Sequence, residues 1–77
     1  MIEEHSSVVL NEPLPAAGLE AGHVGVVVHV HRNGEAYEVE FMTLDGNTLT
    51  VETLTAKQIR AARNRDIPHV RERTAAA

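Results

Sequence analysis

The chain has 77 residues, no cysteine and a formal net charge of −4 at pH 7. Its length suits one small domain with a thin core, and without cysteine neither a disulfide nor a thiolate zinc site can stabilise the fold. The acidic N-terminus, MIEEHSS, lacks the basic and then apolar order of a signal peptide, and no apolar run approaches the roughly 20 residues of a membrane helix. We therefore expect a cytoplasmic protein that does not contact a membrane.

Charge is divided unevenly along the chain. Residues 1–54 hold nine acidic residues and one basic residue, Arg32, a charge of −8, whereas residues 55–77 hold six basic and two acidic residues, a charge of +4. This division predicts either a basic C-terminal segment that packs on an acidic body or one that meets a separate acidic partner.

Short β-strands are predicted in the first half of the chain. Residues 7–10 (SVVL) form a first strand, and residues 11–22 form a long loop because two prolines and two glycines interrupt regular structure there. Residues 24–31 (VGVVVHVH) are dense in β-branched side chains and predict a second strand.

Asn33-Gly34 predicts a two-residue type I′ turn into a third strand, because both central positions of that turn need positive φ. In that register three pairs of apolar side chains share the inward face: Val26 with Phe41, Val28 with Val39, and Val30 with Tyr37. The outward face then pairs His29 with Glu38 and Val27 with Glu40.

Leu44-Asp45-Gly46 predicts the next turn, a three-residue loop with Gly46 in the left-handed conformation. This loop sets Phe41 opposite Leu49, whereas a two-residue turn would set Phe41 opposite Thr50 and mix core with surface. We therefore predict a fourth strand over residues 48–54, with Leu49 and Val51 inward.

The remaining elements complete the predicted fold. Residues 55–58 predict one tight turn and residues 59–61 a short closing strand. Five short strands, a long first loop and tight hairpins are typical of a small SH3-like barrel, whose closure removes sheet edges. We predict an all-β fold, with a five-stranded SH3-like β-barrel over residues 1–62 and an extended or irregular basic C-terminal arm over residues 63–77.

Several short sequence segments follow one another in an order that is also found in a known protein family. These segments are Val8-Val9-Leu10; Leu19, Gly22, Gly25, Val27, Val28 and Val30; Ala36 to Phe41; Thr53-Leu54; and Ile59-Arg60. This order resembles a family of short bacterial proteins that form a domain of unknown function. The segment from Gly22 to Val30 is also similar, more loosely, to KOW-type and nitrile-hydratase-β-type SH3-like barrels. The resemblance implies the barrel and brings no catalytic residues. It also implies the small partner in a two-protein system such as a toxin–antitoxin or immunity pair.

His29 and His31 project from the same face of the second strand, with Glu38 opposite His29. Imidazole and carboxylate groups on a rigid hairpin are zinc ligands. A site needs a further well-placed ligand, which His5 or His23 supplies only if the loops bring it near. The ordinary interpretation is a solvated face with a weak His–Glu pair. We expect no metal, and His29, His31 and Glu38 are the candidate ligands of a metal-binding sensor.

The basic arm carries guanidinium groups that can contact phosphates. Nucleic-acid binding is nevertheless disfavoured, because the body is acidic and the two aromatic side chains, Tyr37 and Phe41, are assigned to the core. A protein partner is the preferred contact. The candidate partner-binding residues are Arg60, Arg63, Arg65, Arg71, Arg73 and Glu40.

No residue constellation for catalysis is present in the sequence. Ser6 and Ser7 lack a nucleophile-elbow context, and Gly22-x-x-Gly25 opens a strand rather than the helix of a phosphate loop. We expect no catalytic residue, no cofactor and no enzyme activity. The preferred function is a non-catalytic protein-interaction or regulatory module, with a homodimer favoured by the thin core. The alternatives are a KOW-like RNA- or ribosome-associated accessory protein and the metal-binding sensor.

Overall fold

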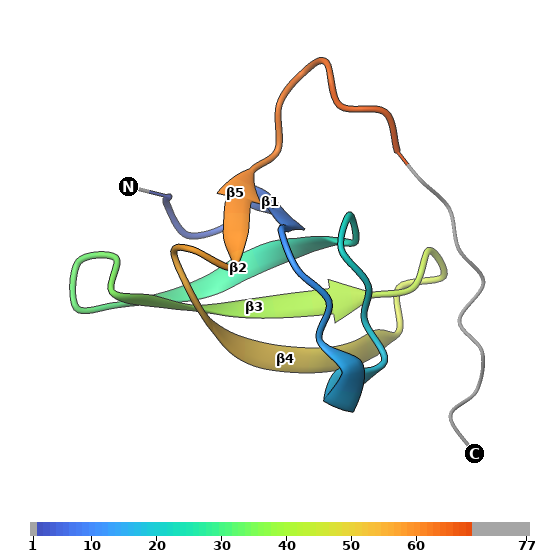
Figure 1. The fold of residues 1–77 in the computed structure, drawn as a ribbon, viewed down its shortest axis with the longest axis horizontal. Helices are drawn as coiled ribbons and strands as arrows, with labels where there is room; N and C mark the ends of the chain where they lie inside the picture. Colours follow the sequence, from blue (N-terminus) through green and yellow to red (C-terminus); the bar gives the residue numbers. More distant parts are fainter. Residues whose placement is uncertain (1, 69–77) are drawn as a thin grey trace.

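The computed structural model describes residues 2–68, and these form an all-β fold, as the sequence predicts. Figure 1 shows its elements, which are β1 (Ser7–Leu10), the 3₁₀ helix η1 (Pro15–Ala17), β2 (Val24–His31), β3 (Ala36–Met42), β4 (Thr48–Thr55) and β5 (Ile59–Ala61). The strands form one antiparallel sheet in the order β4-β3-β2-β1-β5. No ladder joins β4 to β5 in the described part of the chain, so the pairing expected of a closed barrel is not found. Residues 2–68 contain no helix long and apolar enough to cross a membrane.

β2 takes part in both halves of the sheet. Its first residues, Val24–Val26, pair with β1, and the stretch from Val26 to His31 pairs with β3. In Figure 1, β5 runs across the direction of β3 and β4. Gly25 lies at the start of β2, where a Cβ atom would stand 2.9 Å from the Glu40 carbonyl oxygen and 2.6 Å from a Val39 methyl carbon. Only glycine allows so close an approach of β2 to β3.

The core occupies one face of the sheet and draws on every strand. Its buried cluster consists of Val8, Leu10, Leu19, Val27, Tyr37, Val39, Phe41, Leu54 and Ile59. Leu14 packs against this cluster, and its isolated bridge with Leu19 holds the long first loop against the end of the core. Burial of these aliphatic and aromatic side chains is the main stabilising contribution available to so short a chain.

Near its turn, the β2–β3 hairpin has the predicted register. Val30 pairs with Tyr37, and His29 pairs with Glu38. The connection is longer than predicted, however, because the ladder begins at His31 and Ala36 and leaves a loop of residues 32–35.

The loop of residues 32–35 has a left-handed run of three residues. Asn33 (φ 57°) and Gly34 (φ 103°) adopt the positive φ that the sequence predicts, and Arg32 (φ 44°) precedes them in the same region. The N–H groups of Gly34 and Glu35 both donate to the His31 carbonyl oxygen, at 3.0 and 3.1 Å. The left-handed run therefore starts one residue before the predicted two-residue turn.

Farther from the turn, β2 departs from the predicted register because a bulge lies between Val27 and His29. Val27 pairs with Val39 and is fully buried, whereas Val28 is 38% exposed. Val26 pairs with Glu40 on the outward side of the sheet. The prediction that Val26 and Val28 face the core and Val27 faces solvent is wrong, because the extra residue shifts the side-chain alternation by one.

A second bulge lies in β4. The loop Leu44-Asp45-Gly46 has three residues as predicted, with Gly46 at φ 88° and the Thr43 N–H donating to the Asn47 carbonyl at 3.0 Å. The ladder then pairs Met42 with Thr48 but Phe41 with Thr50, which leaves Leu49 as the extra residue. The turn was predicted correctly and the pairing beyond it was not.

This bulge reverses the expected orientation of β4. Val51 pairs with Glu40 and is 48% exposed, so its predicted inward position is wrong. Glu52 pairs with the buried Val39 and is half-buried on the side that was expected to be apolar. Leu54, which pairs with Tyr37, is the buried side chain of β4.

Replacing Gly34 with valine tests the left-handed turn. We expect Gly34→Val to lower the free energy of unfolding by about 1–3 kcal/mol, because a β-branched residue resists the φ of 103° found there. Chemical denaturation measures this change, with Glu35→Val as the control in the same exposed loop. Equal stability of the two variants would contradict the observed turn.

Replacing Gly25 with alanine tests the close approach of β2 to β3. The added methyl group would overlap Val39 and the Glu40 carbonyl, so we expect Gly25→Ala to cost about 1–3 kcal/mol in thermal or chemical unfolding. Gly46→Asn is the control, because no atom lies within 4 Å of a Cβ there and asparagine tolerates positive φ. A stable Gly25→Ala variant would mean that the strands are farther apart.

Candidate functional site

The side of the β2–β3–β4 sheet that points away from the core is the candidate functional surface, here called the outward face. Cross-strand pairing arranges it in rows: His31 with Ala36 and Thr55; His29 with Glu38 and Thr53; and Val26 with Glu40 and Val51. Polar and titratable groups occupy the end nearest the 32–35 loop, and aliphatic side chains occupy the other end. The outward face therefore has two chemically different halves.

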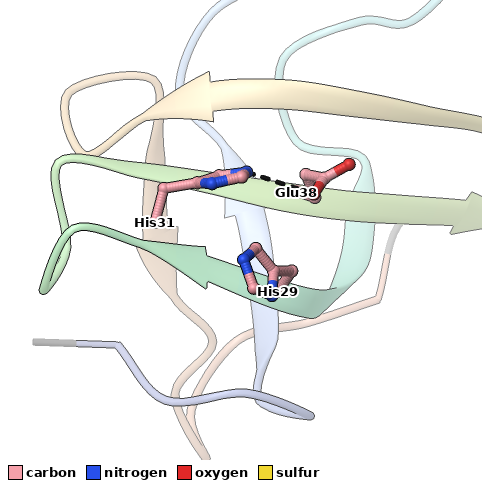
Figure 2. Close-up of side chains that lie close together, drawn as sticks. All are labelled: His29, His31 and Glu38. Atoms are coloured by element: carbon pink, nitrogen blue, oxygen red, sulfur yellow. Dashed lines mark hydrogen bonds and ion pairs between the residues drawn. The ribbon is translucent and has the colours of Figure 1, made fainter.

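At the polar end, the side chains of His29, His31 and Glu38 converge. His31 Nε2 lies 3.1 Å from Glu38 Oε2, and the rings of His29 and His31 meet edge to face with centroids 4.4 Å apart. One ligand atom from each of the three side chains lies within 4.8 Å of the other two. Figure 2 shows His31 directed toward Glu38 on β3, with His29 beside them on β2. These three residues form the His–Glu cluster.

The two further histidines considered from the sequence lie outside the His–Glu cluster. The His5 backbone N–H donates to the Val27 carbonyl oxygen at 2.7 Å, and His23 Nδ1 accepts a hydrogen bond from the Glu20 N–H at 3.1 Å. The sequence did identify the three residues that the fold brings together.

A shallow depression of about 490 Å³ adjoins the His–Glu cluster. It is lined by His31, Arg32, Glu35, Ala36, Glu38 and Thr53. Arg32 and Glu35 form an exposed ion pair at 3.8 Å, which is a weak interaction in water. One side of the cluster is therefore open to solvent and to incoming molecules.

At the other end of the outward face, four aliphatic side chains form an apolar patch. Val24, Met42 and Val51 are 51%, 48% and 48% exposed, and the half-buried Val26 lies among them. Glu40 stands between Val26 and Val51, where the Thr48 hydroxyl donates to its carboxylate at 2.6 Å. Sequence reasoning missed this patch, because it had placed Val26 and Val51 in the core.

The arginines proposed to bind a partner have different environments. Arg60 donates two hydrogen bonds of 2.9 Å to the carboxylate of Asp66, which also accepts the Arg63 backbone N–H at 2.6 Å. These hydrogen bonds, chiefly those from the Arg60 side chain, lower the pKa of Asp66 to about 2. Arg63 and Arg65 are exposed. Arg71 and Arg73 lie outside the described residues.

The pairing of Arg60 with Asp66 was not predicted from the sequence. Asp66 follows Arg63 by three residues, the spacing of a turn in which a carboxylate accepts a nearby backbone N–H. That spacing was an available signal for the turn. The hydrogen bonds from Arg60 to Asp66 also depend on where β5 ends, and the local sequence does not predict that position.

Comparison with known proteins identifies a family. Residues 4–61 match the model of the family described as a domain of unknown function (DUF4926). No curated protein and no solved structure gives a match. The matched residues include all five strands and both halves of the outward face.

The Arg60–Asp66 pair can be tested by titration. We expect an NMR titration of the Asp66 carboxyl carbon to give a pKa of about 2, and Arg60→Ala to raise this pKa toward 3.8. Because the pKa is lower in the folded chain, the stabilisation is present above about pH 4 and is lost as the pH falls toward 2. Arg63→Ala is the control, since it keeps the backbone N–H. An Asp66 pKa that Arg60→Ala leaves unchanged would contradict the pairing.

Proposed function

The chain belongs to the DUF4926 family, which carries no assigned activity, and we propose that it is a non-catalytic protein-interaction module that binds a partner through the apolar patch. The observation that carries this proposal is the exposure of Val24, Met42 and Val51 at one end of the outward face. Contiguous exposed apolar patches often mark protein–protein interaction sites.

The sheet gives this patch a rigid geometry. Val26 and Val51 are both held in register with Glu40 by the β2–β3–β4 ladders. A partner would therefore meet a preformed surface and would lose little conformational entropy in ordering it. Covering the apolar patch favours binding, and the gain that exceeds the costs of association appears as affinity.

The charge near the patch specifies the chemistry of the partner. Glu40 lies in its centre, and residues 1–54 carry a charge of −8. The complementary surface is apolar and bears lysine or arginine opposite Glu40. A second copy that met this face symmetrically would bring Glu40 against Glu40, so a different protein is the favoured partner.

An SH3-like architecture is part of the proposal. The order β4-β3-β2-β1-β5, with β2 shared between the β1 and β3 ladders and a single turn before β5, supports an SH3-like arrangement. In such an arrangement the sheet curves around its own core. Interaction through an outward sheet face is compatible with this curvature, because the patch lies on the side away from the core.

Introducing a charge at Val51 tests the interaction surface. We expect Val51→Lys to weaken partner binding roughly tenfold or more, because the partner would have to bury an ammonium group against its own basic side chains. Stability should change by less than about 0.5 kcal/mol, since Val51 is half exposed. The measurement is quantitative co-purification from the native host, followed by a titration with the purified partner.

Ala16→Lys is the matched control, because it adds the same charge at an exposed residue of η1, outside the patch. We expect this variant to retain the partner. A partner retained equally by Val51→Lys and Ala16→Lys would contradict the proposed surface. Self-association of the isolated chain that Val51→Lys abolishes, measured by sedimentation, would replace the proposed partner with a second copy.

A further inference from the structure

We propose that the His–Glu cluster is a binding site for one divalent transition metal ion, with zinc as the best fit. Its ligands are a nitrogen from each of His29 and His31 and a carboxylate oxygen of Glu38. This inference concerns the polar end of the outward face, and it stands or falls independently of the apolar patch.

The ligand distances suit a tetrahedral ion. With Zn–N and Zn–O bonds of roughly 2.0–2.2 Å, two ligand atoms of a tetrahedral zinc site stand about 3.3–3.6 Å apart. His31 Nε2 and Glu38 Oε2 are 3.1 Å apart, close to this separation, and the ligand atoms of all three side chains lie within 4.8 Å of one another. The His29 nitrogen would have to move closer to the other two ligand atoms when the ion binds.

The donor set also matches the metal. Two imidazoles and one carboxylate are borderline nitrogen and hard oxygen donors, a combination that zinc binds in sites with an open coordination position. The side chain of His29 makes no hydrogen bond within residues 2–68, and its ring packs edge to face against the ring of His31. Its ring nitrogens are therefore available, and the ion would replace the proton shared between His31 and Glu38.

The backbone positions these ligands on two paired strands. His29 lies directly opposite Glu38 in the β2–β3 ladder, and His31 lies two residues farther along β2 on the same side. His29 keeps the outward position that the register at the turn gives it, and the bulge at Val28 allows Val27, two residues earlier, to be buried. The ligands thus stand on a scaffold fixed by core packing.

The remaining coordination position would face the open depression beside the cluster. Glu35 and Thr53 line that depression together with His31 and Glu38. A water molecule or a donor atom from a bound molecule can complete the tetrahedron there. The site is thus built for an ion that exchanges with solvent.

Zinc titration of the untagged full-length chain tests the proposal. We expect calorimetry to show one zinc ion per chain, and His29→Ala and Glu38→Gln each to weaken binding roughly tenfold or more. Zinc should also raise the melting temperature of the unmodified chain and not that of the variants, because only the folded state presents the three ligands. Replacement by cobalt should give the visible absorption of a four-coordinate ion.

His23→Ala is the matched control, because His23 lies outside the cluster. We expect it to bind zinc as the unmodified chain does. The proposal is overturned if no heat is detected up to about 1 mM zinc, or if His23→Ala weakens binding as much as His29→Ala. The variants must keep the melting temperature of the metal-free chain, and Glu38→Gln, which preserves the shape of the side chain, provides the second test if His29→Ala unfolds.

Discussion

The orientation of side chains on β2 depends on one extra residue, Val28. Val27 and His29 are two positions apart and would share a face in a regular strand. The bulge between them places Val27 in the core opposite Val39 and leaves His29 outward opposite Glu38. The extra residue therefore allows β2 to fill the core with Val27 while His29 keeps the position opposite Glu38 that the register at the turn gives it.

Close packing of β2 explains how one small sheet can enclose a core. Gly25 lets β2 approach β3 closely, and the neighbouring residues of β2 also pair with β1. β1 in turn carries β5, whose Ile59 packs into the same core as Leu54 from the opposite edge strand. Bulges in β2 and β4 increase local twist and bend the strands.

The outward face joins two kinds of chemistry on one rigid surface. Its cluster of imidazole and carboxylate groups suits a metal ion, and its apolar patch around Glu40 suits a basic and apolar partner. After β5, the basic segment is folded back by the Arg60–Asp66 pair, which removes Arg60 from the charges available to a partner. Arg63 and Arg65 remain exposed in the same segment.

The sequence by itself determined the strands, the three-residue loop at Leu44-Asp45-Gly46 and the His29–Glu38 pairing, because β-branched runs and glycine at positive φ act locally. It left the bulges undecided. Val26, Val27 and Val28 are chemically equivalent, so the sequence does not predict which of them is buried in the core. Val51 likewise suited an inward position but is exposed, whereas Leu49 and Leu54 contact the core. Only the tertiary structure decided these alternatives, because the stability of a bulge depends on contacts with strands distant in sequence.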